Sequence, residues 1–171
     1  MKDKTVIVQT NVGKETLLTY IKEDQIHVIP SAVRKMNYSG NNLYPNEGKI
    51  HLFTMVEFGI RKMFDVLYNY VRNEDNITLY RIGGVTYKKY YEECMKIKQK
   101  NIVYLGYIDE GTAADYMKYA YYFVFNTVNE GQGLPPMEAM LPNTQPVLND
   151  LTVFRGIMGI CHIITITKNH S

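Results

Sequence analysis

The sequence predicts an α/β protein in which a parallel sheet carries helices on both of its faces. From residue 50 onward, short β-rich runs alternate regularly with longer runs of helical periodicity. Successive strand–helix–strand units of this kind pair their strands in parallel and pack the helices over the sheet. The run Tyr121–Phe125 is apolar without alternation, as expected for a strand that is covered on both faces. Together these observations indicate a Rossmann-like fold.

Length and composition narrow the possible functions. The 171 residues suit one domain, or one domain and part of another. A net charge of +2 without a basic cluster argues against nucleic-acid binding. No apolar run approaches the roughly 18 residues of a membrane span, and the polar start Met1–Lys4 does not resemble a signal peptide. Cys94 and Cys161 lie far apart, which fits a reducing, cytoplasmic location without a disulfide framework.

The first 49 residues are predicted to form a small unit and a linker. The expected elements are strand Thr5–Gln9, helix Lys14–Lys22 and strand Ile26–Pro30, the last of which is stopped by its proline. Residues 34–49 are rich in Asn, Gly, Tyr and Pro, a composition typical of loops. We therefore expect a first unit over residues 1–33, a linker over 34–49 and the main domain over 50–171.

The main domain continues the alternation of strands and helices. The expected strands are His51–Met55, Ile77–Ile82, Ile102–Leu105, Tyr121–Phe125, Val147–Leu148 and, near the end of the chain, Ile160–Thr167. The expected helices are Arg61–Arg72, Tyr87–Gln99, Thr112–Ala120 and Pro135–Met140, where a proline suits the first turn. Ligands of such sheets bind beyond the carboxyl ends of the strands. The loops after residues 55, 82, 106, 126 and 149 are therefore the places to look for a site.

One glycine-rich turn between a buried strand and a helix carries two carboxylates. Its backbone amides can point at a ligand together with the positive end of the helix, and they belong to Gly131, Gln132, Gly133 and Leu134. Glu130 precedes the turn and Glu138 lies about one turn into the helix, so both carboxylates can flank one site. Carboxylates accept hydrogen bonds from paired hydroxyl groups, which makes a sugar or a ribose a natural ligand. The alternative is a plain glycine turn with two solvated glutamates.

The motif Glu130-Gly-Gln-Gly-Leu-Pro-Pro-Met-Glu138-Ala-Met resembles the signature of the retaining glycosyltransferases of family 4, whose two glutamates are separated by seven residues. The glycines, the proline, both glutamates and the Ala-Met pair match in register. Further segments fall in the family's order, namely Ile26–Pro30, Arg61-Lys62, Leu79–Gly83, Asn101–Gly106, Asp115–Thr127 and Pro146–Asp150. The resemblance covers roughly residues 5–160.

This resemblance implies the GT-B architecture, in which two Rossmann-like domains enclose the active site and the C-terminal domain binds a nucleotide-sugar donor. The chain would comprise that donor domain, truncated at its C-terminus, with residues 1–33 as the end of the N-terminal domain. The implied reaction transfers a hexose from a nucleoside-diphosphate sugar to a glycan or lipid-linked acceptor and needs neither metal nor cofactor. The implied location is cytoplasmic, with peripheral membrane attachment as an open alternative.

The resemblance also implies roles for single residues. Glu138 matches the glutamate that binds the donor ribose, Glu130 matches the one beside the transferred sugar, and Lys62 matches a basic residue on the diphosphate. The turn residues that would contact the sugar and the diphosphate are Gly131, Gln132, Gly133 and Leu134. The family usually has an arginine five or six residues before the lysine, where this chain has Glu57 and Val56. The second diphosphate cation is therefore missing or comes from elsewhere, with Arg61 as a candidate.

Other interpretations stay open at this stage. The chain could be an inactive remnant, or one chain of a split glycosyltransferase that binds the donor and takes its acceptor domain from a separate chain. A plain flavodoxin-like binding domain is a third possibility, and Arg61-Lys62 could simply begin a helix on a solvated face. The four histidines show no metal-ligand spacing.

Overall fold

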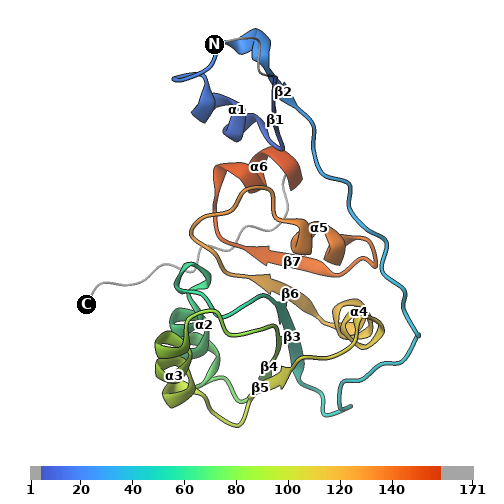
Figure 1. Cartoon of the computed structure of the whole chain (residues 1–171). Coiled ribbons are helices and arrows are strands. Elements are labelled where there is room, and N and C mark those ends of the chain that lie inside the picture. Colours follow the sequence, from blue (N-terminus) through green and yellow to red (C-terminus); the bar gives the residue numbers. More distant parts are fainter. Residues whose placement is uncertain (1–4, 159–171) are drawn as a thin grey trace.

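The computed structural model describes residues 5–158, which form two parallel sheets (Figure 1). The small sheet pairs β1 (Val6–Val8) with β2 (Ile26–Val28). The large sheet has the strand order β5-β4-β3-β6-β7, and all of its strands run parallel. Its strands are β3 (Ile50–Met55), β4 (Ile77–Ile82), β5 (Ile102–Gly106), β6 (Tyr122–Phe125) and β7 (Gln145–Leu148). The Rossmann-like parallel sheet that the sequence predicts is confirmed.

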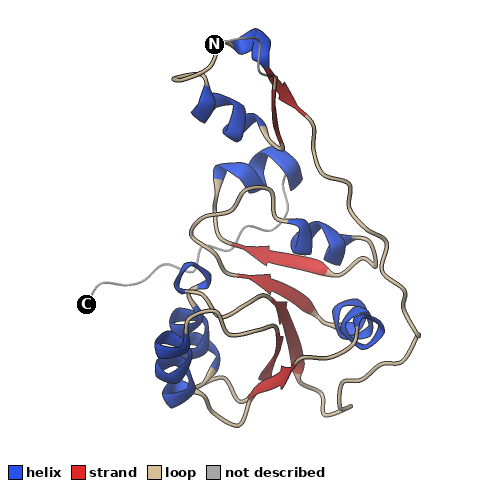
Figure 2. Cartoon of the chain, in the orientation of Figure 1, coloured by secondary structure: helices blue, strands red, loops and turns tan. Residues whose placement is uncertain are grey.

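Helices cover both faces of the large sheet (Figure 2). On one face, α2 (Phe64–Val71) and α3 (Lys88–Ile97) pack over a buried cluster that includes Phe58, Phe64 and Leu79. On the other, α4 (Glu110–Tyr119) and α5 (Leu134–Met140) cover a second cluster around Phe53 and Phe123. Because both faces of β6 are buried, its sequence is a continuous apolar run without alternating polar residues.

The segment between the two sheets contains no helix or strand over residues 29–49. It runs alongside the large sheet and is held to α4 (Figure 1). The backbone N–H groups of Ser39 and Gly40 donate to the Asp115 carboxylate at 3.0 and 3.1 Å, and the Tyr44 hydroxyl donates to the Tyr116 carbonyl at 2.7 Å. Residues 34–49 therefore connect the sheets as an extended segment, while the assignment of residues 1–33 to an N-terminal domain stays a prediction.

Two helices differ from the sequence prediction by more than a shift of one or two residues at their start. The predicted bounds Lys14–Lys22 are wrong, because α1 spans Asn11–Leu17 and the Thr10 hydroxyl caps its start by accepting from the Gly13 N–H at 3.1 Å. The expected helix Arg61–Arg72 is split. Residues Ile60–Lys62 form a 3₁₀ turn, and α2 follows only after Met63, whose φ of 44° is left-handed.

The end of the described chain holds a helix that the sequence pattern did not indicate. α6 spans Thr152–Met158 and lies beside α1 (Figure 1). Its Phe154 is 1% exposed and packs on Phe125 with 6.0 Å between the ring centroids. The predicted strand Ile160–Thr167 lies outside the described residues. Among residues 5–158, no helix combines the length and the apolar character that crossing a bilayer requires.

Candidate functional site

Lys62 and Glu130 meet at the carboxyl edge of the large sheet. Lys62 follows β3 and Glu130 follows β6, two neighbouring strands whose ends lie side by side. The Lys62 Nζ donates to Glu130 Oε2 at 2.9 Å and lies 4.4 Å from the centroid of the Phe125 ring. The side chains are 10% and 23% exposed. The predicted diphosphate cation is therefore a largely buried ammonium group paired with the first carboxylate of the motif, and not a lysine on a solvated helix face.

The short 3₁₀ turn separates Lys62 from its neighbour. Arg61 is exposed, whereas Lys62 is buried. The turn is anchored to the loop after β6, since the Asn126 side chain donates to the Met63 carbonyl at 2.9 Å. The Val128 N–H donates to the Arg61 carbonyl at 3.0 Å. These two bonds hold the backbone on either side of Lys62 against the loop that leads from β6 into the Glu130 motif.

The glycine turn is shaped by one left-handed residue and one side-chain contact. Gly133 has φ +81°, and a Cβ atom there would lie 2.5 Å from the Phe154 ring, so that only glycine fits. The Gly131 N–H donates to Glu130 Oε1 at 3.0 Å. Gln132 is 5% exposed and pairs its amide with both backbone groups of Ser31, each at 3.2 Å. Gln132 therefore ties the turn to the segment between the sheets.

Glu138 sits in different surroundings from Glu130. It lies in the second turn of α5 and is half-buried. Burial raises the pKa of the Glu138 carboxyl, Arg34 lowers it and Glu110 raises it further. Arg34 and Glu110 are themselves ion-paired at 3.2 Å. Glu138 thus belongs to a group of two carboxylates and one cation in which its ionised form is disfavoured.

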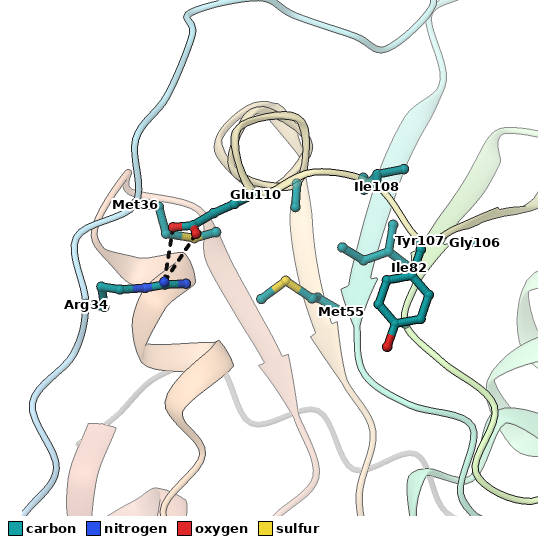
Figure 3. Close-up of a pocket in the computed structure, with 10 residues that line it drawn as sticks. Arg34, Met36, Met55, Ile82, Gly106, Tyr107, Ile108 and Glu110 are labelled. Carbon is teal, nitrogen blue, oxygen red and sulfur yellow. Dashed lines mark hydrogen bonds and ion pairs between the residues drawn. The ribbon is translucent and has the colours of Figure 1, made fainter.

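A cavity of about 300 Å³ opens beside this charged group (Figure 3). Its walls come from the carboxyl ends of β3, β4 and β5, from the start of α4 and from the segment between the sheets. They are mainly apolar and include Met36, Met55, Ile82, Tyr107 and Ile108. Arg34 and Glu110 line the same cavity and point toward one another (Figure 3). A cavity of this size and lining is typical of small-molecule sites.

The sequence-predicted site residues therefore divide into two groups. Lys62 and Glu130 contact each other, and the turn of Gly131, Gln132, Gly133 and Leu134 links them in sequence to Glu138. Within residues 5–158 no hydrogen bond joins Glu130 with Glu138, and Arg61 faces solvent. Sequence reasoning missed Arg34 and Glu110. Glu110 had a usable signal, because it follows the strand end at Gly106, where ligands of parallel sheets bind.

No protein-family model matches the chain, and no curated protein matches it in sequence. Solved structures do resemble it. Anabaena HepE, in complex with UDP and glucose, has a TM-score of 0.74 and 12% identity over 88% of this chain and 45% of its own. The pneumococcal O-GlcNAc transferase GtfA, in complex with UDP and GlcNAc, has a TM-score of 0.69 and 18% identity over 96% of this chain and 34% of its own. WaaG, a glycosyltransferase involved in lipopolysaccharide biosynthesis, has a TM-score of 0.68 and 14% identity over 84% of this chain and 44% of its own.

These likenesses confirm the predicted fold class, a parallel sheet with helices on both sides as found in GT-B glycosyltransferases. The chain spans less than half the length of each of these three proteins. At identities of 12–18% the likeness concerns the fold and does not by itself assign a reaction. The chain thus has the fold of a glycosyltransferase half, with two carboxylates and a buried lysine at the edge where such folds bind ligands.

Proposed function

We propose that the chain is the donor-binding part of a retaining glycosyltransferase of the family 4 type. Its donor is a nucleoside-diphosphate hexose, and its acceptor is a glycan or a lipid-linked sugar. The observation that carries the proposal is the contact between Lys62 and Glu130. These residues lie 68 positions apart, and the family resemblance gives them neighbouring roles, on the diphosphate and beside the transferred sugar.

The cavity and Glu138 supply the remaining parts of a donor site. A flat nucleobase suits the apolar cavity beside Tyr107, a residue that is 89% exposed. Arg34 and Glu110, which line that cavity, both act on the pKa of Glu138, and we place the ribose between the cavity and the Glu138 carboxylate. The diphosphate would then extend toward Lys62. This order matches the linear structure of a nucleotide sugar from base to ribose, diphosphate and hexose.

Lys62 suits the chemistry of the proposed leaving group. When the bond between the anomeric carbon and the diphosphate oxygen breaks, negative charge grows on the diphosphate. A largely buried ammonium group stabilises that charge more strongly than a solvated one, because little water screens it. Glu130 pairs with this cation, and the donor would take over part of that contact. The acceptor hydroxyl would attack from the side of the leaving group, lose its proton toward the departing diphosphate oxygen and retain the anomeric configuration.

Turnover of donor sugars by the full chain tests this proposal. UDP-glucose, UDP-GlcNAc and GDP-mannose are incubated with the chain, and release of the free nucleoside diphosphate is followed by ion-exchange chromatography. We expect slow release from one of them, which Lys62→Met and Glu130→Gln abolish. Release that is unaffected by both substitutions contradicts the assignment of this site.

A second candidate function is donor binding without turnover, as an inactive remnant or as one chain of a split enzyme. It is favoured by Val56 and Glu57, which stand where the resemblance expects a second diphosphate cation. Saturable nucleotide binding together with no release of nucleoside diphosphate favours this candidate. A separate chain that restores turnover when mixed with this one identifies the split enzyme.

A further inference from the structure

Arg81 is a fully buried arginine near the carboxyl edge of the large sheet. It lies in β4, one residue before the strand ends, and is 0% exposed. Within residues 5–158 no carboxylate forms an ion pair with it, and its Nε and Nη1 atoms have no hydrogen-bond partner there. Burial lowers the pKa of the guanidinium. A buried cation without a counter-charge lowers the stability of the fold. Stabilising the sheet therefore does not explain why an arginine occupies this position.

Aromatic rings enclose the guanidinium group of Arg81. Its central carbon lies 3.5 Å from the centroid of the Phe58 ring, 4.6 Å from that of Phe64 and 4.8 Å from that of Tyr104. Cation–π contacts of this kind partly replace the lost hydration of the charge. They come from three separate places in the chain, namely the loop after β3, the start of α2 and the neighbouring strand β5. The cation therefore joins these elements beneath the carboxyl edge.

The polar contacts of Arg81 go to the loops that follow β3 and β4. Its Nη2 donates to the Val56 carbonyl at 3.0 Å and to the Gly84 carbonyl at 3.4 Å. The Phe58 N–H also donates to the Gly84 carbonyl, at 2.8 Å. A Cβ atom on Gly83 would lie 2.2 Å from the Val56 oxygen, which shows how closely the two loops cross. Arg81 lies beneath this crossing and donates hydrogen bonds to both loops.

The clamped loop leads directly to Lys62. Only Glu57 to Arg61 separate the Val56 carbonyl from Lys62, and Phe58, which covers the guanidinium, lies four residues before it. The far end of the same loop is held by Asn126 and Val128. Backbone hydrogen bonds also hold the near end, since Val56 and Phe58 pair with Ile82 and with the loop after β4. Arg81 adds the side-chain part of this near anchor, and its loss should let the Lys62 backbone shift away from the place where a diphosphate would lie.

We propose that Arg81 is a positioning residue, which clamps the loop after β3 to the loop after β4 and so holds Lys62 in place for an anionic ligand. This inference rests on the proposed function for the role of Lys62. The clamp itself is independent of the proposed function, because it is defined by the contacts of Arg81 alone. Substituting a residue that only stabilises the fold would lower the affinity for all ligands alike. Substituting a residue that positions Lys62 lowers the affinity only for ligands with a diphosphate.

The test compares UDP and uridine on Arg81→Met, in which an unbranched apolar side chain replaces the guanidinium group and its donors. We expect the Kd of UDP to rise about tenfold and that of uridine to stay within about twofold. Hydrogen–deuterium exchange of residues 56–63 should become faster than in the unchanged chain. Should Arg81→Met fail to fold, Arg81→Lys keeps the buried charge but not the bridge between two carbonyls, and the same results are expected.

Asn101→Ala is the matched control. Asn101 is also a buried polar residue that donates to backbone carbonyls, those of Val71, Glu74 and Ile77, but at the opposite end of the sheet. Its loss should lower thermal stability and leave the ratio of UDP to uridine affinity unchanged.

The outcomes separate the two proposals. Unchanged UDP affinity in Arg81→Met, or an equal loss of UDP and uridine affinity, overturns the positioning role while the donor site stands. If the unchanged chain binds none of UDP, GDP and ADP, the proposed function fails. In that case, unchanged exchange of residues 56–63 in Arg81→Met overturns the clamp as well, and faster exchange supports it.

Discussion

The two ends of the large sheet are built differently. At the amino end, polar groups are used to close the structure: the Asn101 amide donates to three carbonyls, and Tyr44 stacks on His51 with 4.8 Å between the ring centroids. At the carboxyl end, the Lys62–Glu130 pair and the half-buried Glu138 stand beside a cavity. Polar groups there carry charge, and one of them lies in surroundings that disfavour its ionised form.

We propose from this difference that the amino end stabilises the fold and that the carboxyl end binds a ligand. Charges that lose water without full compensation reduce stability, and sites that must interact with a ligand accept that cost. Glycines at positive φ occur at both ends, but a Cβ atom would clash only at the carboxyl end, at Gly83 (φ +122°) and at Gly133 (φ +81°), among the described glycines of positive φ. Substitutions at the amino end should therefore change stability alone, and those at the carboxyl end should change binding.

The largest effect on stability is expected at the carboxyl end, at Gly133. This residue is an exception to the division between the two ends, because both the fold and the site depend on it. Gly133→Ala places a methyl group 2.5 Å from the Phe154 ring at a left-handed φ, and we expect a loss of about 2–4 kcal/mol of unfolding free energy. Thermal melting measures it. Gly131→Ala is the control, since no atom lies within 4 Å of its Cβ position. Equal melting temperatures for the two variants would show that the turn adopts another shape.

The next largest effect is expected on ligand binding at the carboxyl end. Lys62→Met removes the buried cation, and the Kd of UDP should rise about 10- to 100-fold while that of uridine is unchanged. Isothermal titration measures both. Arg61→Met, one residue away but exposed, is the control and should have a smaller effect. A larger loss from Arg61→Met would assign the diphosphate contact to the exposed side chain instead.

A smaller effect is expected at the amino end. The Thr144 hydroxyl, just before β7, donates to the Met117 carbonyl at 2.7 Å. Thr144→Val keeps the shape and removes this bond, which should cost about 1 kcal/mol of unfolding free energy. Chemical denaturation measures the cost, and UDP titration serves as the control. A change in UDP affinity without a change in stability would contradict the division between the two ends.

The smallest effect concerns the dependence of stability on pH. Because burial raises the folded-state pKa of Glu138, its protonated form is favoured in the folded chain. The resulting stability is present below the unfolded-state pKa and is lost as the pH rises through the folded-state pKa. Glu138→Gln should therefore gain stability relative to the unchanged chain as the pH rises from 4 to 8. Melting curves across this range that run parallel would rule out the raised pKa.

Much of this architecture could be predicted from the sequence, because it depends on local patterns. The strands follow runs of β-branched and aromatic residues, and the motif from Glu130 to Glu138 marks one carboxyl end. The contact between Lys62 and Glu130 depends instead on the adjacency of β3 and β6, which no local pattern indicates. What the resemblance implies about donor, sugar and acceptor stays a prediction.

The features that escaped prediction depend on contacts between distant residues. The pairing of Gln132 with Ser31 joins residues 101 positions apart, and no local pattern indicates it. Arg81 occupies a strand position that sequence alone gives no reason to bury. The left-handed Met63 breaks a helical pattern because the Asn126 side chain holds its carbonyl. Tertiary contacts overrode local preference at each of these points.

The central claim, that the carboxyl end binds a nucleoside diphosphate, is tested most directly by isothermal titration of the full chain with UDP, GDP and ADP. Each nucleotide is also titrated into Glu138→Ala, with Thr144→Val as the folded control. We predict saturable binding of at least one nucleotide, lost or strongly weakened in Glu138→Ala and preserved in Thr144→Val. Absence of binding by all three nucleotides, or equal binding by Glu138→Ala, would contradict the claim.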